Sequence, residues 1–572
     1  MMETALSPER ARLLQLLRSK GRHIGNDILA QTLHGLGITH IFGTGGAPVD
    51  ATLAACARAG MRVIATRHQQ AAVLMSLAHN YVSGALRSAV IVPPGPCVTN
   101  CVTGVLVGHD NCWPLLVVSG RLAHSRRGSF QSLDGSRLMA SITKFAAPID
   151  RADSLASSVS QAVITATAGT PGPVYLDIAE EALTGSAEFC APGTSAPGVT
   201  HPATLDAPVD MPQPANLRDA VSLLSGARRP AMLIGKGARW SAASAFLRRL
   251  ADDYSIPFAT SPMGRGLLPD DHPLCFSAIR GRMLADADVV LMVGARFNWT
   301  FRFGNEISTS AQIVRIDVDP VEAAEVLGRG VGLQGDASCV LQHVLGTLDA
   351  NTTIHPIARD TEWLNELKTL RAASAPGIVP AAELGLQPMS PYEWLGELST
   401  FMPENAITVL DGNVVMTSAQ RMLSVHHPAT RLGPGTTGCM GIGVPFAIGA
   451  KLARPDLPVI AIVGDFAFGL SALELETALR YQVPVVLIVA NNGGPGGATR
   501  QRKVFPADHP ERVLQFVPGI RHDLMMASFG GLGLRIDGPG QLGSALSDAL
   551  ASNGPVCIDV VTNENTGVSA AI

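Results

Sequence analysis

Short apolar runs, bounded by Gly or Pro, alternate along this chain with longer segments whose apolar residues recur at helical spacing. The runs are apolar throughout, which is typical of parallel strands buried on both faces of a sheet. In the first third of the chain they read HIFG, RVIAT, SAVIVPP, PLLVVSG and GPVYLDI. Strands that alternate with helices in this way predict an α/β fold built on parallel sheets.

The pattern divides into three blocks, at 22–190, 217–350 and 391–572. The second block offers the strands PAMLIG, PFATS, DVVLMVG and QIVRIDVD, and the third offers AITVLDG, PVIAIVGD, PVVLIVANN, LRIDG and PVCIDVV. The segment 191–216 is rich in Pro, Ala and Thr, and 351–390 is mixed, so we interpret both as linkers. We therefore predict three doubly wound parallel-sheet domains, of which the first and third have a similar strand rhythm.

Composition narrows the class of protein. Three domains suit a chain of 572 residues, and 47% apolar with only 16% charged residues indicates large buried cores. The net charge of −4 provides no basic field, so nucleic acid is not an expected partner. The 9 cysteines are scattered, and no apolar run is long enough to span a membrane. We expect a cytoplasmic protein with reduced thiols and no membrane partner.

The strongest chemical signal lies at 463–494, VGDFAFGLSALELETALRYQVPVVLIVANNGG. Gly464 and Asp465 follow one predicted strand and Asn492 follows the next, so the carboxyl ends of neighbouring parallel strands bring them together. With the main-chain carbonyl of Gly494 they form an oxygen-only set that suits Mg²⁺, and the Gly-rich surroundings let backbone N–H groups approach a diphosphate. The alternative is a plain βαβ unit in which Asp465 caps the helix. The helical segment between the strands carries apolar residues at Leu470, Leu473, Leu475 and Ala478.

The stretch GDFAFGLSALELETALRYQVP, followed by NN, resembles the thiamine diphosphate (ThDP) signature. It is most similar to the form in oxalyl-CoA decarboxylases and 2-hydroxyacyl-CoA lyases, where the usual third residue is Ser and this chain has Phe466. The resemblance extends to GPCVTN and HDNCWPLLVVSG, GSFQ and ITKFAAPI, ADADVVLMVGARFNWTFRFG, and GPGTTGCMGIGVPFAIGAK. It implies a pyrimidine-binding domain, a middle nucleotide-binding-like domain and a diphosphate-binding domain. It also implies bound ThDP and Mg²⁺, and a homodimer or homotetramer with active sites between two subunits.

The same resemblance assigns roles to individual residues. Met440 would support the V-shaped cofactor, the Gly438 carbonyl would face its 4′-amino group, and Asn413 would lie near the diphosphate. Phe130 and Gln131 would line the substrate side. Taken singly, these residues have plainer interpretations, such as a core methionine, a turn residue or a solvated loop amide. The full set of predicted cofactor-binding residues is Asn413, Gly438, Met440, Gly464, Asp465, Phe466, Ala467 and Asn492.

The chain departs from the family at Gln69, in ATRHQQAAVLM, where the resemblance expects a catalytic glutamate. That glutamate exchanges a proton with N1′ of the aminopyrimidine, whereas an amide donates a hydrogen bond but has no proton to exchange near neutral pH. The usual scale of such a loss is ~10²–10⁴ in rate. Three explanations stand: a native enzyme limited by a later step, a laboratory Glu→Gln replacement, or a non-catalytic relative. Cys97 also replaces the second Gly of the family's GPG, so we expect a crowded or rearranged loop.

The predicted reaction is cleavage of a 2-hydroxyacyl-CoA to formyl-CoA and an aldehyde or ketone, or the reverse condensation. Arg280, Arg282 and Arg296 are candidates for contacts with CoA phosphates. The alternative within the same class is a carboligase of the acetolactate synthase or benzaldehyde lyase type, or a 2-keto-acid decarboxylase. From another class, the chain is a ThDP-fold binding protein without turnover.

Overall fold

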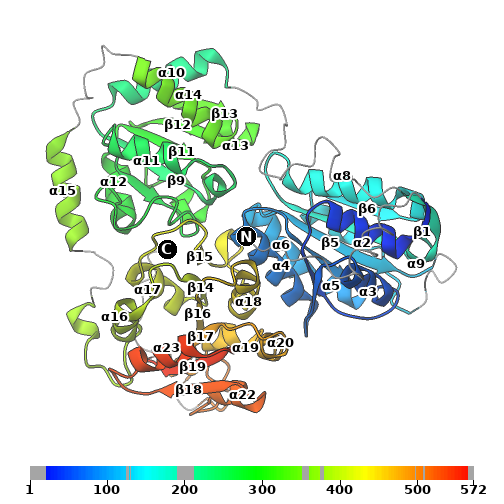
Figure 1. The fold of residues 1–572 in the computed structure, drawn as a ribbon. Coiled ribbons are helices and arrows are strands. Elements are labelled where there is room, and N and C mark those ends of the chain that lie inside the picture. The colour runs from blue at the N-terminus through cyan, green and yellow to red at the C-terminus, as the bar shows by residue number, and fades with distance from the viewer. Residues whose placement is uncertain are drawn as a thin grey trace, which may run out of the picture. The chain divides into compact units, whose positions relative to one another are not determined.

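The structure, a computed structural model, describes residues 21–123, 128, 130–189, 212–350, 360–373, 379–495, 497–506 and 509–563. The chain divides into two compact units, Met1–Ala207 and Pro208–Ile572, which Figure 1 colours from blue to cyan and from cyan-green to red. Most of the segment predicted as the first linker, 191–216, lies outside the described residues. Among the described helices, none has the length and apolar character needed to cross a membrane.

The first unit contains a six-stranded sheet in the order β3-β2-β4-β5-β7-β6, with every pair parallel. The first and last strands of the unit, β1 and β8, form a separate two-stranded antiparallel ribbon. The strands are β1 (Gly21–Ile24), β2 (His40–Gly43), β3 (Arg62–Ala65), β4 (Ser88–Val92), β5 (Leu115–Arg121), β6 (Phe145–Ile149), β7 (Pro173–Ala179) and β8 (Ser186–Phe189). The helices are α2 (Gly25–Gly35), α3 (Asp50–Arg58), α4 (Gln69–Ser83), α5 (Pro96–Thr99), α6 (Val102–Asn111), α7 (Gly135–Met139), α8 (Leu155–Thr167) and α9 (Glu180–Thr184).

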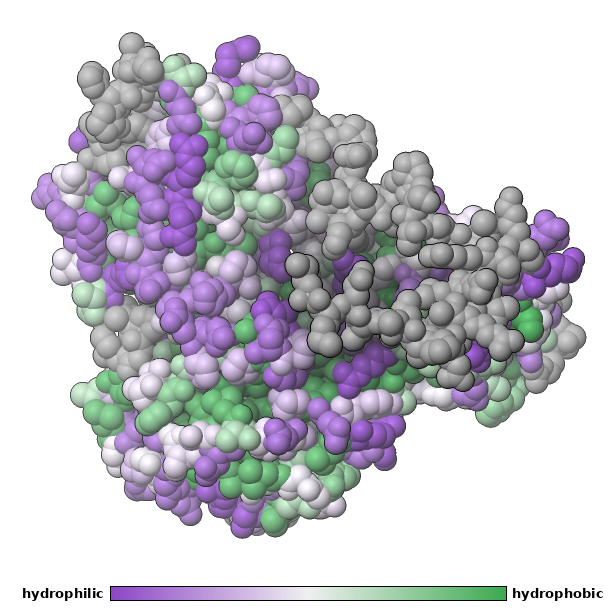
Figure 2. All heavy atoms as spheres, viewed as in Figure 1, coloured by the Kyte–Doolittle hydropathy of each residue, from purple (hydrophilic) through white to green (hydrophobic). Residues whose placement is uncertain are grey.

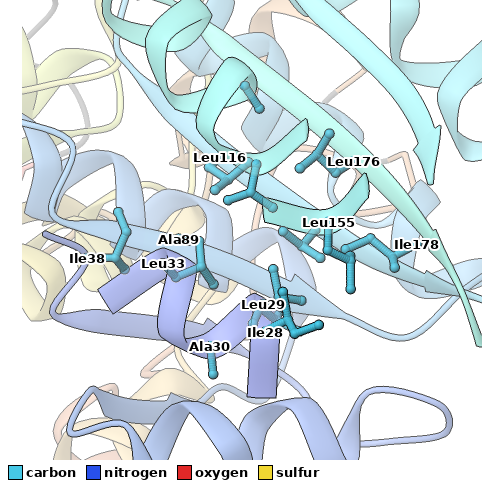
Figure 3. Packing of buried hydrophobic residues seen from close by; sticks show 14 of the residues in the cluster. Ile28, Leu29, Ala30, Leu33, Ile38, Ala89, Leu116, Leu155, Leu176 and Ile178 are labelled. Carbon is cyan, nitrogen blue, oxygen red and sulfur yellow. The ribbon is translucent and has the colours of Figure 1, made fainter. Parts of the chain in front are cut away.

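Both faces of this sheet are buried, as the uninterrupted apolar runs predict. On one face Ile28, Leu29 and Leu33 of α2 pack toward strand residues that include Leu116 and Leu176 (Figure 3). The strand residue Phe42 points to the opposite face, where its ring meets His79 of α4 at 6.0 Å. Each fully buried aliphatic side chain contributes roughly 1.5–3 kcal/mol, so this two-sided burial fixes the sheet between two helical layers.

The second unit begins with a five-stranded parallel sheet in the order β10-β9-β11-β12-β13. Its strands are β9 (Pro230–Ile234), β10 (Phe258–Thr260), β11 (Val289–Val293), β12 (Gln312–Asp317) and β13 (Gly330–Gln334). Its helices are α10 (Pro214–Gly226), α11 (Ser244–Asp252), α12 (Arg280–Asp286), α13 (Pro320–Ala324), α14 (Ala337–Ala350) and α15 (Thr361–Ala372). Helix α15 lies within the segment predicted as the second linker, 351–390, and its Trp363 and Leu367 join a core cluster of this sheet.

The remaining sheet has six parallel strands in the order β15-β14-β16-β17-β19-β18. Its strands are β14 (Ile407–Asp411), β15 (Arg431–Leu432), β16 (Val459–Gly464), β17 (Val486–Asn491), β18 (Leu532–Ile536) and β19 (Val556–Val561). Its helices are α16 (Pro391–Phe401), α17 (Val414–Met422), α18 (Gly443–Ala453), α19 (Asp465–Gly469), α20 (Glu474–Arg480), α21 (Gly497–Val504), α22 (Asp523–Ser528) and α23 (Leu542–Ala551). Counted in chain order, both six-stranded sheets run 2-1-3-4-6-5, so the similar strand rhythm reflects one topology used twice.

Within the second unit, a buried ion pair ties the five-stranded sheet to the six-stranded one. Arg265 donates from Nε to Asp270 Oδ2 at 2.8 Å and from a terminal nitrogen to the Leu423 carbonyl at 3.1 Å. Asp270 also accepts from the Val425 amide at 2.8 Å. Since Leu423 and Val425 follow α17, this pair fixes the elements that carry the candidate site described next.

Candidate functional site

The predicted cation ligands meet at the carboxyl edge of the six-stranded sheet of the second unit. Asp465 follows β16, Asn492 follows the adjacent parallel strand β17, and Gly494 lies two residues further on. The buried Asp465 carboxylate accepts from the Phe466 amide at 2.7 Å and from the Gly494 amide at 2.8 Å. The fold therefore brings these three residues together at the point where their strands end.

The side-chain amide of Asn492 faces the oxygens of the two other predicted cation ligands. With its nitrogen turned toward them, it donates to the Gly494 carbonyl at 2.9 Å and to Oδ1 and Oδ2 of Asp465 at 3.3 and 3.2 Å. Rotation of the amide would place its oxygen there instead, so that all three residues could offer oxygen to a cation. Oxygens on an octahedral Mg²⁺ are separated by about 3.0 Å along an edge, since each Mg–O bond is about 2.1 Å. The donor set and its spacing therefore fit Mg²⁺.

The charge state of Asp465 supports a cation. Burial raises the pKa of this carboxyl to about 6, although the surrounding amides of 492–494 and Phe466 favour the ionised form. A bound divalent ion would offset the cost of burying that charge. Across the described residues, no cluster of three His, Cys, Asp or Glu side chains is arranged to hold a metal. The candidate cation site thus combines one carboxylate with an amide and a main-chain oxygen.

Glycines let the ends of β14 and β16 approach each other closely beside the predicted cation ligands. A Cβ on Gly412, which follows β14 with φ of +106°, would lie 3.2 Å from the Gly464 nitrogen after β16. Such a backbone-lined edge suits the approach of a diphosphate. Asn413, the next residue, is exposed and its side chain makes no capping hydrogen bond to α17. Phe466 is half-buried and Ala467 buried in the turn that continues from Asp465.

Asp411 is a structural carboxylate that sequence reasoning missed. It is fully buried and accepts from the Gly412 and Gly443 amides, each at 2.7 Å. Burial raises its pKa to about 6. Asp411 thereby joins the end of β14 to the Gly-rich turn before α18. The available signal was its position at the end of the apolar run AITVL, the same position that Asp465 has after VIAIVG.

The turn before α18 carries the predicted Gly438 and Met440. Gly438 adopts a left-handed conformation with φ of +64°, and the Met440 side chain is 38% exposed, so Met440 is not a core methionine. The hydroxyl of Thr437 is buried and has no hydrogen-bond partner among the described residues. An unpartnered polar atom beside an exposed methionine is what a turn that receives a ligand would present.

Residues at the carboxyl edge of the five-stranded sheet donate hydrogen bonds to this turn. Trp299 donates from its indole nitrogen to the Thr436 carbonyl at 2.8 Å, while Lys236 and Asn298 each donate to the Thr436 hydroxyl at 3.4 Å. These three residues follow β9 and β11, at the carboxyl edge of their sheet. Their contact with Thr436 was not predicted from the sequence, because the residues are far apart along the chain and only the fold brings them together.

An aromatic pair and a buried side-chain amide support the segment 492–494, which carries two of the predicted cation ligands. The rings of Phe466 and Phe516 stack at 6.3 Å, and the Phe516 amide donates to the Gly493 carbonyl at 2.8 Å. Gln501 in α21 donates to the Glu511 carbonyl and accepts from the Leu514 amide, both at 2.8 Å. Phe466, where the family has Ser, is therefore accommodated by an aromatic partner from the loop that follows α21.

The first unit contains the other group of predicted residues. Gln69 is the first residue of α4 and is half-buried. Its amide nitrogen donates to the Thr44 hydroxyl at 3.1 Å and to the Cys97 sulfur at 3.3 Å. Its amide oxygen accepts from the Asn100 amide at 2.9 Å. Helix α5, which carries Cys97, is thus in direct contact with Gln69.

Gln131 lies against Gly95, the residue immediately before α5. A Cβ on Gly95, which has φ of +66°, would come within 2.9 Å of the Gln131 carbonyl oxygen. Gln131 itself has φ of +59°, and the neighbouring Phe130 is 80% exposed. The first unit therefore brings Gln69 and the Phe130–Gln131 pair to one short segment, 95–100, which contains α5, while the predicted cation and diphosphate residues gather in the second unit.

The helical segment predicted after Asp465 forms two short helices instead of one. Leu470 and Leu473 lie in the turn between them and are 58% and 56% exposed. Figure 2 shows that apolar residues lie among polar ones on the visible face of the molecule. Other apolar residues of this domain that face solvent are Val504, Val513 and Val517.

The three candidate arginines for CoA phosphates all have carboxylate partners. Arg280 pairs with Glu306 at 2.9 Å, Arg282 with Asp286 at 2.8 Å and Arg296 with Glu322 at 3.2 Å. These charges are balanced within the protein. These three guanidinium groups are therefore less suited to bind CoA phosphates than the sequence suggested.

A parallel α/β fold with a candidate cation site at the carboxyl edge of a sheet is typical of proteins that bind a phosphorylated cofactor. Comparison with known families agrees and is more specific. The chain matches the thiamine pyrophosphate enzyme N-terminal TPP binding domain at 24–138, the central domain at 217–344 and the C-terminal TPP binding domain at 412–560. The chain belongs to the thiamine pyrophosphate enzyme family. The predicted fold class and the cofactor ThDP, which is thiamine pyrophosphate, are thereby confirmed.

Similar curated proteins cover nearly the whole chain. The 2-hydroxyacyl-CoA lyase of Oryza sativa is 31% identical over 96% of this chain and 96% of its own length. The oxalyl-CoA decarboxylase of Escherichia coli is 30% identical over 97% of each chain. The acetolactate synthase large subunit of Mycobacterium tuberculosis is 31% identical over 95% of this chain and 96% of its own. The similarity to the first two was expected from the signature.

Proposed function

We propose that this protein is a ThDP- and Mg²⁺-dependent enzyme that cleaves or forms a carbon–carbon bond next to a carbonyl group, in the manner of 2-hydroxyacyl-CoA lyases. The observation that carries the proposal is that the Asn492 side-chain amide lies within 3.3 Å of both the Gly494 carbonyl oxygen and the Asp465 carboxylate. Membership of the family supplies the cofactor, and the relatives named lyase and decarboxylase supply the reaction class.

The residues of the second unit have distinct roles in this proposal. Asp465, Asn492 and the Gly494 carbonyl hold Mg²⁺, and the backbone at Gly464 and Asn413 lies along the diphosphate. Met440 and the Gly438 carbonyl position the two rings, with Phe466 and Ala467 forming the wall that continues from Asp465. Bound ThDP would supply a nucleophilic carbon and an electron sink for the bond that breaks.

The residues of the first unit act on the pyrimidine and on the substrate. Gln69 donates a hydrogen bond to the pyrimidine ring, and Phe130 and Gln131 line the substrate side. Because an amide does not titrate near neutral pH, Gln69 orients the ring but does not exchange a proton with it. The rate of cofactor activation is then set by other groups or by a slower later step.

Two observations bear on the substrate and point in different directions. Acyl-CoA is favoured by the relatives named 2-hydroxyacyl-CoA lyase and oxalyl-CoA decarboxylase, whereas the internal pairing of Arg280, Arg282 and Arg296 favours a free 2-keto acid or aldehyde. The second candidate is therefore an acetolactate synthase or benzaldehyde lyase-type carboligase, or a 2-keto-acid decarboxylase. A ThDP-fold binding protein without turnover is the candidate from another class.

One experiment separates these candidates. Protein with ThDP and Mg²⁺ is mixed with a 2-hydroxyacyl-CoA or with a 2-keto acid plus an aldehyde, and products are identified by mass spectrometry. Aldehyde and formyl-CoA would support the lyase, and an acyloin would support the carboligase. Cofactor binding without product from either mixture would indicate the binding protein, and absence of Mg²⁺-dependent ThDP binding would refute the whole proposal.

We also propose a homodimer or homotetramer with active sites between subunits. The exposed Leu470 and Leu473 support it, because large apolar side chains grouped in one turn are typical of an interface. Light scattering of the purified protein gives the mass directly. The cytoplasmic location stays a prediction from the sequence.

A further inference from the structure

The neighbours of Gln69 form a pocket that fits an amide better than a carboxylate. The amide nitrogen faces two acceptors, the Thr44 hydroxyl at 3.1 Å and the Cys97 sulfur at 3.3 Å. The amide oxygen faces a donor, the Asn100 side-chain nitrogen at 2.9 Å. Both hydrogens of the nitrogen and one lone pair of the oxygen are therefore engaged, which fixes the orientation of the amide.

A carboxylate at position 69 would need a different set of hydrogen bonds from the same neighbours. Asn100 would still donate, but the Thr44 hydroxyl and the Cys97 thiol would both have to reverse from acceptor to donor. A thiol is a weak donor, and burial raises the pKa of Cys97, so it stays a neutral S–H at physiological pH. The carboxylate would thus exchange two N–H donations for one sound and one weak hydrogen bond.

Cys97 is the neighbour that distinguishes this chain, because the family resemblance places glycine there. With glycine at 97, Gln69 would have only Thr44 as acceptor for its two N–H hydrogens. The Thr44 hydroxyl also has a hydrogen bond with the Cys97 side chain, so it keeps a partner when a ring nitrogen of a bound ligand takes over the N–H that faces Thr44. Cys97 can therefore keep its own hydrogen bond to the amide when the ligand binds, and it holds the other N–H toward the ligand.

We propose that Cys97 is a positioning residue for Gln69, and that the two form a coupled pair which presents an N–H donor to the pyrimidine ring. Gln69 is then a native adaptation and not a damaged glutamate. The part of this inference that concerns the pyrimidine rests on the proposed function, whereas the coupling of Gln69 to Cys97 does not.

A double-mutant cycle tests the coupling. The four proteins are the native chain, Gln69→Glu, Cys97→Gly and the double variant. Calorimetry with Mg²⁺ gives the dissociation constant for ThDP, and thermal unfolding of the cofactor-free forms gives a readout that needs no ligand. We expect Cys97→Gly to weaken ThDP binding about fivefold in the native background, the usual scale for one hydrogen bond, and by less than about twofold in the Gln69→Glu background. Equal effects in the two backgrounds would overturn the proposal.

Conservative variants separate positioning from packing. Cys97→Ser keeps an acceptor and should bind ThDP within about twofold of the native protein, whereas Cys97→Ala should lose as much as Cys97→Gly without adding backbone freedom. Loss in the serine variant equal to that in the alanine variant would overturn the proposal. If the native protein fails to bind ThDP, the proposed function is wrong, and the unfolding cycle of the cofactor-free proteins still decides the coupling.

Discussion

Replacement of Asp465 by asparagine removes the only carboxylate among the three predicted cation ligands while keeping the shape of the side chain. Mutation of groups that merely support a metal ligand typically costs 10–100-fold in affinity. Loss of the charged ligand itself should therefore cost at least about 100-fold in Mg²⁺-dependent ThDP binding, or roughly 2.8 kcal/mol.

The same substitution should leave the cofactor-free protein folded. Burial raises the pKa of Asp465 from 3.8 to about 6, which corresponds to roughly 3 kcal/mol against the ionised form once the pH is above 6. Asparagine removes that cost but can keep only one of the two backbone hydrogen bonds, a loss of about 1 kcal/mol. We expect Asp465→Asn without metal to be as stable as the native protein or more stable, by up to about 2 kcal/mol.

The assay is calorimetric titration of ThDP at fixed Mg²⁺, paired with thermal unfolding in a metal chelator. The control is Asp456→Asn, an exposed residue paired with Arg454 at 2.7 Å on the same sheet domain. It should change neither readout, because surface ion pairs contribute little. Native-like cofactor affinity in Asp465→Asn would refute the cation site, and unfolding of the cofactor-free variant would refute the reasoning about its buried charge.

Three further perturbations test other parts of the molecule. Asp270→Asn leaves the Arg265 guanidinium buried without its partner, so it should cost about 3–5 kcal/mol in urea unfolding, and a cost below about 1 kcal/mol would contradict this. Burial lowers the pKa of His40 to about 4 and of His79 to about 3, below the unfolded value of 6.5, so both histidines reduce stability as the pH falls from about 6.5 to 4. His79→Phe should therefore lose less stability than the native protein between about pH 7.5 and 4.5, and parallel pH curves would exclude this contribution. Leu473→Lys places a charge on an exposed apolar residue and should reduce the mass found by light scattering, whereas an unchanged oligomer would place the interface elsewhere.

The sequence was sufficient for the strands that lie inside the sheets. Runs such as SAVIV and PVVLIV have neighbours on both sides and helices on both faces, so nearly every residue is apolar and the pattern is unambiguous. The strands it missed lie at edges or outside the main sheets, as do β6 and β13. An edge strand has one neighbour and tolerates residues such as Pro148 or Gly330, so its apolar pattern is weak.

The residues of the candidate site also divide into those that the sequence could identify and those that it could not. Asp465 and Asn492 could be found because each follows a buried strand, and adjacent parallel strands must end at the same edge. Leu470 and Leu473 could not be assigned, because the sequence does not show that the helix is interrupted between Gly469 and Glu474.

By itself, then, the amino-acid order determined which strands form inside the sheets, which carboxylate and amide reach one sheet edge, and which cofactor family they resemble. Only the tertiary structure decided that Trp299 holds Thr436 and that Cys97 and Asn100 orient Gln69. The physical reason is that periodicity and strand ends are local properties of the chain. A hydrogen bond between residues 28 or 137 positions apart depends instead on how loops from separate elements pack, and no local pattern records that distance.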